Sequence, residues 1–151
     1  MTKCLTIAQP YAFLIQTGVK RVENRTWMTG YRGPLYIHAG KSRDWLTLDR
    51  EDKFDTAYNI SIDQLAFGAI VALATLVDCV HIGRVAQPHI AAKYPWLEAH
   101  EHTQGPWCWI LDKVTPLVPR PWRGAQGLFN VDEEELNRQA NAALGVLEGG
   151  A

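Results

Sequence analysis

The chain contains the stretch Gly18-Val19-Lys20-Arg21-Val22-Glu23-Asn24-Arg25, in which charged residues recur at fixed spacing behind a glycine. In an extended strand, successive side chains point to opposite faces, so Glu23 and Arg25 would share one face, with Lys20 at the turn into it. A carboxylate between two cations stays ionised and holds both in place. The spacing therefore predicts a small charged pocket floor. The alternative is an edge strand with a surface ladder of ion pairs, which would contribute little to stability.

Short helices and strands are expected on both sides of this stretch. The residue patterns predict strands at Thr2–Ile7, Arg21–Trp27, Leu35–Ala39, Ala69–Val80, Trp107–Val118 and Gly127–Val131. They predict helices or helical turns at Gln9–Thr17, Ser42–Tyr58, Asp63–Phe67, Ile90–Lys93 and Asp132–Leu147, and a proline-stiffened loop at Pro119–Gly124. Strands and helices do not alternate regularly, so the fold class is α+β with a mixed barrel rather than a doubly wound sheet.

The length and composition indicate one globular domain. A chain of 151 residues with 47% hydrophobic residues is expected to form a single domain over residues 1–151, with a core at about 3–131 and a C-terminal helix at 132–147. The three cysteines form no CxxC pair, which is typical of reduced thiols in a cytoplasmic protein. No signal peptide or membrane-spanning segment is evident, so no membrane partner is expected.

The charges are distributed unevenly along the chain. The net charge is −1, but residues 1–43 hold seven of the fifteen lysines and arginines and only one of the sixteen acidic residues. One basic face on an otherwise neutral or acidic body would engage few phosphates, and its binding would be modest and salt-sensitive. The alternative is that these cations do not gather on one surface.

The Gly-x-Lys-x-x-Glu-x-Arg pattern resembles the signature of the ASCH domain family, and the likeness covers most of residues 5–131. The segments Leu5–Ala12, Tyr31–Ala39, Gly68–Val71, Gly105–Leu111 and Gly124–Phe129, together with Trp27, look like further segments of that family. The resemblance implies a PUA-like mixed β-barrel surrounded by several α-helices. Many such barrels bind RNA or modified bases, and the family also includes proteins that resemble a ribonuclease and an acetylcytidine amidohydrolase.

The residues and the resemblance together indicate a set of ligand-binding residues. Lys20 and Arg25 could contact phosphate or a base carbonyl, Glu23 could accept from an exocyclic amine, and Tyr11 or Trp27 could stack on a base. His38 could line the same cleft or be a satisfied wall residue. The full set is Gln9, Tyr11, Lys20, Glu23, Arg25, Trp27, His38, Lys41 and Gln126.

Hydrolysis is the alternative chemistry. A lysine beside a carboxylate can activate water or polarise an amide, and the proposed catalytic lysine of the amidohydrolase branch falls on Lys20. That branch has a threonine where this chain has Glu23, so Lys20 and Glu23 are catalytic candidates only if the protein is an enzyme. Scattered cysteines and histidines (Cys79, His81, His100, His102 and Cys108) match no established zinc spacing, so no metal and no cofactor are expected.

The leading expectation is therefore a nucleic-acid-binding module that takes RNA, or a single nucleotide of it, in a charged cleft. Its walls would be the first helix, the Lys20–Trp27 strand and the Pro119–Gly127 loop. The rival is a hydrolase of the same fold that acts on an acylated nucleoside or on RNA. DNA stays a possible ligand, and a protein-interaction module that docks a partner on the acidic C-terminal helix is the third reading.

Overall fold

The protein is described by a computed structural model, which covers residues 1–47 and 60–149. One six-stranded sheet forms its centre, with the strands in the order β2-β5-β4-β3-β1-β6. The strands are β1 (Thr2–Ile7), β2 (Val22–Arg25), β3 (Gly33–Ala39), β4 (Ala69–His81), β5 (Trp107–Pro121) and β6 (Leu128–Val131). β1 and β3 are parallel, and the other neighbours are antiparallel. This mixed sheet with separate helices confirms the expected α+β class.

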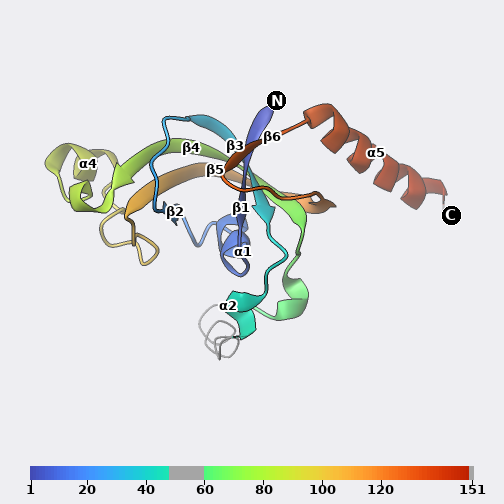
Figure 1. Ribbon diagram of the computed structural model, residues 1–151, viewed down its shortest axis with the longest axis horizontal. Coiled ribbons are helices and arrows are strands. Elements are labelled where there is room, and N and C mark those ends of the chain that lie inside the picture. Colours follow the sequence, from blue (N-terminus) through green and yellow to red (C-terminus); the bar gives the residue numbers. More distant parts are fainter. Residues whose placement is uncertain (48–59, 150–151) are drawn as a thin grey trace.

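The helices lie around and beyond this sheet. They are α1 (Tyr11–Gln16), α2 (Asp44–Thr47), α4 (Pro88–Lys93) and α5 (Glu133–Gly149), with short 3-10 turns at Ile62–Gln64 and Ile82–Arg84. Figure 1 shows α4 and α5 at opposite ends of the molecule, with α1 near the middle of the sheet. Of the expected helix Ser42–Tyr58, residues 48–59 lie outside the described residues. No helix in the described ranges is long and apolar enough to cross a membrane.

The main core lies between α1 and the sheet. Ala12 and Ile15 of α1 are fully buried and belong to one apolar cluster with Ile37 of β3 and Trp109 of β5. The apolar residues of α1 follow one another at helical spacing, so one face of the helix is covered by the sheet. Burial of this face fixes α1, and with it the turn that leads into β2.

Strand β5 is longer than the sequence suggested. The expected loop at Pro119–Gly124 is wrong in its first part, because β5 runs to Pro121, with Arg120 opposite Ile70 and Pro121 opposite Ala69. Proline lacks an amide donor, and within sheets it is tolerated at strand edges. In the described residues β2 pairs only with the first four residues of β5, so the rest of β5 has an edge that prolines can occupy.

The sheet curves strongly but is not a closed barrel. Among the described strands, β2 pairs only with β5 and β6 pairs only with β1, so these two strands are the edges of the sheet. β2 has four residues, and no backbone ladder joins it to β1. The expected barrel is corrected in this respect: the side between β2 and β1 is joined by side chains.

The C-terminal helix α5 begins beside the sheet and extends away from it (Figure 1). Asp132 caps it, because the Asp132 carboxylate accepts from the backbone N–H groups of Glu134 and Glu135 at 2.9 and 3.3 Å. Leu136 is only 1% exposed and packs in a small cluster with Cys4, Ile70 and Val131. The cap and this buried leucine fix the first turns of α5 against the sheet.

Candidate functional site

The glycine at the start of the signature segment (Gly18–Arg25) positions the charged residues that follow. Gly18 has φ +84°, a left-handed conformation that side chains rarely adopt, and it ends α1 as the sequence predicted. The chain then turns back, and the backbone N–H of Lys20 donates to the carbonyl of Leu14 at 2.9 Å. Lys20 is thereby anchored to the last turn of α1 before β2 begins.

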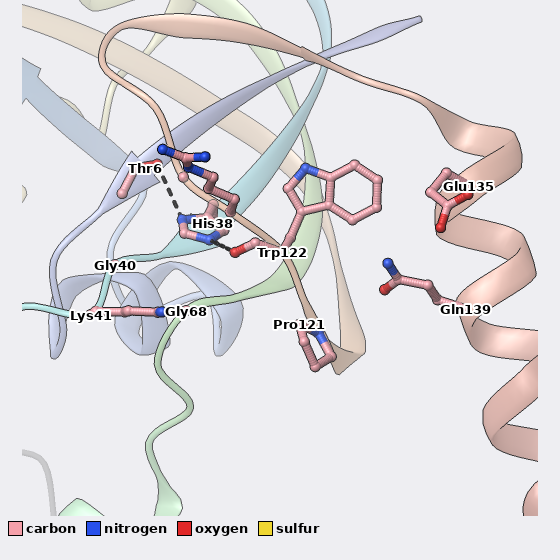
Figure 2. Close-up of a pocket in the computed structure, with 11 residues that line it drawn as sticks. Thr6, His38, Gly40, Lys41, Gly68, Pro121, Trp122, Glu135 and Gln139 are labelled. Atoms are coloured by element: carbon pink, nitrogen blue, oxygen red, sulfur yellow. Dashed lines mark hydrogen bonds between the residues drawn. The ribbon is translucent and has the colours of Figure 1, made fainter.

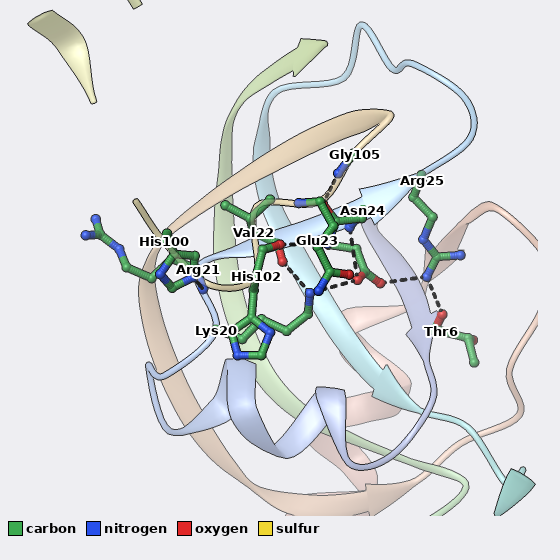
Figure 3. Close-up of polar contacts among 11 residues, drawn as sticks. Thr6, Lys20, Arg21, Val22, Glu23, Asn24, Arg25, His100, His102 and Gly105 are labelled. Atoms are coloured by element: carbon green, nitrogen blue, oxygen red, sulfur yellow. Dashed lines mark hydrogen bonds and ion pairs between the residues drawn. The ribbon is translucent and has the colours of Figure 1, made fainter. Parts of the chain in front are cut away.

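Lys20, Glu23 and Arg25 form a compact ion triad (Figure 3). The Glu23 carboxylate lies 3.5 Å from the Lys20 amine through Oε1 and 2.9 Å from the Arg25 guanidinium through Oε2. The side chains of Lys20 and Glu23 are 4% and 10% exposed, and that of Arg25 is 25% exposed. The shared face predicted from the spacing is present, but the triad is a buried cluster rather than an exposed ladder of ion pairs.

The triad also joins two strands that no backbone ladder connects. The Arg25 guanidinium donates through Nη2 to the backbone carbonyl of Thr6 in β1 at 2.8 Å. The same nitrogen faces Glu23, so the carboxylate holds the guanidinium at the distance needed to reach β1. Hydrogen bonds from charged donors are roughly twice as strong as neutral ones, which suits a contact that replaces a ladder.

Burial sets the electrostatics of Lys20. Loss of water lowers the pKa of the Lys20 amine, and the neighbouring Glu23 carboxylate opposes this by raising it. The amine also donates to the carbonyl of Val22, and it lies 5.8 Å from the centre of the Tyr11 ring. The charge of Lys20 is therefore compensated on several sides within the fold.

Thr6 connects the triad to a histidine. The Thr6 hydroxyl lies 3.1 Å from His38 Nδ1, and His38 Nε2 lies 2.7 Å from the carbonyl of Trp122. A carbonyl only accepts, so Nε2 carries a proton, and in the neutral imidazole Nδ1 accepts a hydrogen bond from the Thr6 hydroxyl. Burial lowers the pKa of His38, and Lys41 acts in the same direction, so the neutral form is favoured.

A pocket of about 840 Å³ lies on the far side of His38 (Figure 2). Its volume is within the range of sites that enclose small ligands. The ends of β1, β3 and β5, the start of β4 and one face of α5 surround it. The lining residues are Thr6, His38, Gly40, Lys41, Gly68, Pro121, Trp122, Arg123, Gly124, Glu135 and Gln139.

Backbone hydrogen bonds hold the rim of this pocket together. Gly40 N–H donates to Ile7 at 3.0 Å, Gly68 N–H to Ala39 at 2.8 Å, and Trp122 N–H to Gly68 at 3.0 Å. These bonds tie the ends of the strands around the pocket to one another. The backbone of the rim is therefore held in place, which fixes the Cα positions from which the lining side chains extend.

Two glycines allow the close packing of the pocket walls. A Cβ on Gly124 would lie 2.8 Å from both the imidazole carbon of His38 and the hydroxyl of Thr6. A Cβ on Gly68, which has φ +63°, would lie 2.8 Å from Cε of Lys41. Side chains at these positions would displace His38 and Lys41, so the glycines let the chain pass directly over both.

The structure separates the expected ligand residues into two groups. His38 and Lys41 line the pocket, whereas the signature residues lie behind it and reach it through Thr6. Gln9 is 1% exposed, and its amide is used in hydrogen bonds to Ala66 and Phe13. The other three lie away from the pocket lining: Tyr11 packs edge-on against Trp45, Trp27 packs edge-on against Trp109, and Gln126 is exposed.

Several lining residues were not expected from the sequence. Trp122 and Arg123 lie in the segment that was expected to form a wall, but they were not singled out as site residues. Glu135 and Gln139 come from α5, for which the sequence indicates an acidic C-terminal helix and, in the third reading, a surface that docks a protein partner. Their spacing of four residues places them on one face of the helix. The spacing predicts that they share a surface, but it does not predict which part of the protein that surface will face.

The loop after α4 packs against the other side of β2. The backbone N–H of Arg21 donates to His100 Nε2 at 3.1 Å, and the rings of His100 and His102 are 5.5 Å apart. In the described ranges no third cysteine, histidine or acidic residue joins them in a group that could hold a metal ion. Burial lowers the pKa of both histidines.

Replacing the central acid of the triad tests its structural role. Glu23→Gln would leave the buried charges of Lys20 and Arg25 without their acidic partner, a loss that typically costs about 3–5 kcal/mol. In a domain of this size, where each kcal/mol shifts Tm by about 2–4 °C, Tm should fall by roughly 6 °C or more. Glu98→Gln, at an exposed position, is the control. A Tm within one degree of wild type for Glu23→Gln would contradict the assignment.

The three packed histidines predict an acid-sensitive fold. The pKa values of His38, His100 and His102 are lowered in the folded state, so below about pH 6.5 the unfolded chain binds more protons. Stability should therefore fall as the pH drops from 7.5 to 5.5, which calorimetry at each pH would measure. His38→Gln should flatten this dependence, whereas His89→Gln, on the exposed side of α4, serves as the control. A Tm that rises on acidification would contradict the prediction.

Comparisons with known proteins agree with this fold. Over 139 residues the chain is 23% identical to activating signal cointegrator 1 of Homo sapiens, which covers 87% of this chain and 22% of the relative. It is 50% identical over 40 residues to the Mus musculus protein of the same name, covering 26% of this chain and 7% of the relative. The chain thus spans at most about a fifth of the length of these relatives.

Solved structures show the same architecture. The crystal structure of ASCH from Zymomonas mobilis superposes with a TM-score of 0.53 at 13% identity, covering 93% of this chain and 94% of that one. A point mutant of the same Zymomonas mobilis protein gives 0.53 at 14% identity, covering 93% and 96%. The model of the ASCH domain family matches residues 5–133, so the resemblance noted in the sequence is confirmed, and the chain belongs to the ASCH domain family.

Proposed function

We propose that this ASCH domain binds single-stranded RNA by taking one nucleotide into the pocket between Lys41, Trp122 and α5. The observation that carries the proposal is the pairing of two exposed cations with a half-buried indole on a fixed backbone frame. Membership of a family with a PUA-like fold is consistent with RNA as the ligand. The buried triad supports the pocket from behind, with Arg25 as its most exposed member.

The cations of the pocket rim suit a phosphate group. Lys41 and Arg123 are both exposed, and the stem of Lys41 lies over Gly68, which directs its amine along the rim. An arginine matches phosphate with a planar fork of donors, whereas a lysine acts as a point charge. Few further cations lie at this pocket, so the interaction would be local rather than an extended basic track.

The indole of Trp122 suits a base. Figure 2 shows the ring of Trp122 between the His38 side of the pocket and α5. The backbone carbonyl of Trp122 is hydrogen-bonded to His38 Nε2. The half-buried indole packs against the cluster of Cys4, Ile70, Val131 and Leu136, and a ring held by packing loses little freedom when a base stacks on it. Base stacking of this kind is tolerant of sequence, and it favours single strands, whose bases are not already paired.

Lys20 and Glu23 do not suit direct contact with a polynucleotide. Their side chains are 4% and 10% exposed, and each is already engaged by the other and by neighbouring groups. They can affect binding indirectly, by holding residues of the pocket in position, because Arg25 and Thr6 link the triad to His38. The signature would therefore act on binding by holding the pocket floor in place.

Hydrolysis is a second candidate, and one observation favours it. Burial lowers the pKa of Lys20, and a hollow of about 280 Å³ includes Lys20 and Arg21 among its lining residues. A lysine with a lowered pKa beside a carboxylate is a known arrangement for proton transfer. Turnover of an acylated cytidine or of RNA that Lys20→Met abolishes, without loss of folding, would favour this candidate.

Fluorescence anisotropy with a labelled single-stranded RNA of eight to ten nucleotides tests the proposal. Lys41→Ala and Arg123→Ala should each weaken binding about threefold to tenfold, because each removes one phosphate contact. The double variant Lys41→Ala/Arg123→Ala should reduce the slope of log K against log salt by about 0.7, the value for one neutralised phosphate on a single strand, and each single variant by part of that.

Lys93→Ala is the matched control, because Lys93 is 65% exposed on α4 at the opposite end of the molecule. This variant should bind as wild type does. Equal losses for all three variants would indicate diffuse electrostatic attraction and contradict the proposed pocket. The same sequence made as DNA shows whether the 2′-hydroxyl contributes to binding.

A further inference from the structure

The wall of the pocket formed by α5 differs chemically from the rim on the sheet. Glu135 and Gln139 are four residues apart and therefore lie side by side on one face of the helix. Figure 2 shows Gln139 extending from α5 toward Trp122, with Glu135 lying closer to the helix one turn away. The burial of Leu136 and the Asp132 cap fix this part of α5 against the sheet.

This difference gives a bound nucleotide one favoured orientation. The phosphate belongs at the rim, because Lys41 and Arg123 lie there, whereas the lining residues that α5 contributes, Glu135 and Gln139, are not cations. If the base stacks on Trp122, its polar edge is the part of the nucleotide that faces α5. The groups of α5 are therefore placed to contact the base rather than the backbone.

The polar atoms of α5 are available for such a contact. Glu135 uses Oε2 in an ion pair with Arg138 at 2.6 Å, and this pair is largely exposed, so it contributes little. Within the described part of the chain, neither Oε1 of Glu135 nor the side-chain amide of Gln139 makes a hydrogen bond. A carboxylate only accepts, whereas an amide both donates and accepts.

These atoms match some bases better than others. Adenine, cytosine and guanine each carry an exocyclic amine, which can donate to a carboxylate oxygen while the neighbouring ring atoms meet the amide. Uracil has carbonyl oxygens on both sides of its one N–H group, and a carbonyl that faces a carboxylate is unfavourable. The α5 wall is therefore selective by both attraction and repulsion.

We infer that Glu135 and Gln139 contact the polar edge of the bound base and make the pocket prefer a base with an exocyclic amine over uracil. This inference rests on the proposed function. Glu135 is then a specificity residue for the base. Its removal should have two opposite effects: it should weaken discrimination between bases and strengthen, or leave unchanged, binding of uracil-containing RNA.

The experiment compares binding of oligo(A), oligo(C) and oligo(U) of equal length at one salt concentration. Wild type should bind at least one amine-bearing oligomer about fivefold or more tightly than oligo(U), the scale of one good base contact. Oligo(G) is left out because it forms multistranded structures. Glu135→Ala should reduce this ratio toward one, with unchanged or tighter binding of oligo(U), and Gln139→Ala should reduce the ratio as well.

Glu134→Ala is the matched control, because it removes the same charge from the neighbouring position of α5 without changing the pocket lining. It should keep the preference of wild type. A wild type that binds all three oligomers equally, or prefers oligo(U), overturns the inference while the proposed function stands. A preference that survives Glu135→Ala also overturns it. A wild type that binds none of the three overturns the proposed function itself.

Discussion

The geometry of the candidate site depends on the ion pairs that the Glu23 carboxylate makes with Lys20 and Arg25. The carboxylate fixes the Arg25 guanidinium 2.9 Å away, and Arg25 then reaches the Thr6 carbonyl at 2.8 Å. A short edge strand such as β2 cannot pair its backbone with β1 on the far side of a curved sheet. A charged side chain spans that distance, and a buried acid keeps it in the required geometry.

The consequences of this contact extend to the pocket. Thr6 accepts from Arg25 through its carbonyl and donates from its hydroxyl to His38, which in turn donates to the carbonyl of Trp122. Four side chains and two carbonyls thus connect the signature to the pocket wall. A floor held in this way needs little rearrangement when a ligand binds, which lowers the ordering cost of binding. In this chain the signature segment lies behind the pocket and is linked to it through Thr6 and His38.

The sequence predicted local features well. Strand Thr2–Ile7 was predicted with the bounds that are observed, Gly18 ends α1, and Glu23 shares a face with Arg25, because periodicity and turn chemistry are local properties. The length of β5 was underestimated, since two prolines, Pro119 and Pro121, argue for a loop unless the strand edge is known to be free. The open sheet and the α5 wall depend on tertiary packing, and periodicity carries no information about which distant segment a face will meet.

A nuclear magnetic resonance titration with short single-stranded RNA tests the central claim most directly. The resonances of the Trp122 indole N–H and of the backbone amides of Lys41, Gly124 and Gln139 should shift as RNA is added. All of these shifts should fit one dissociation constant. The indole N–H resonance of Trp96, which lies near α4, should not shift. Shifts confined to Trp96 and α4, with Trp122 unmoved at saturating RNA, would show that the ligand binds elsewhere and would contradict this account.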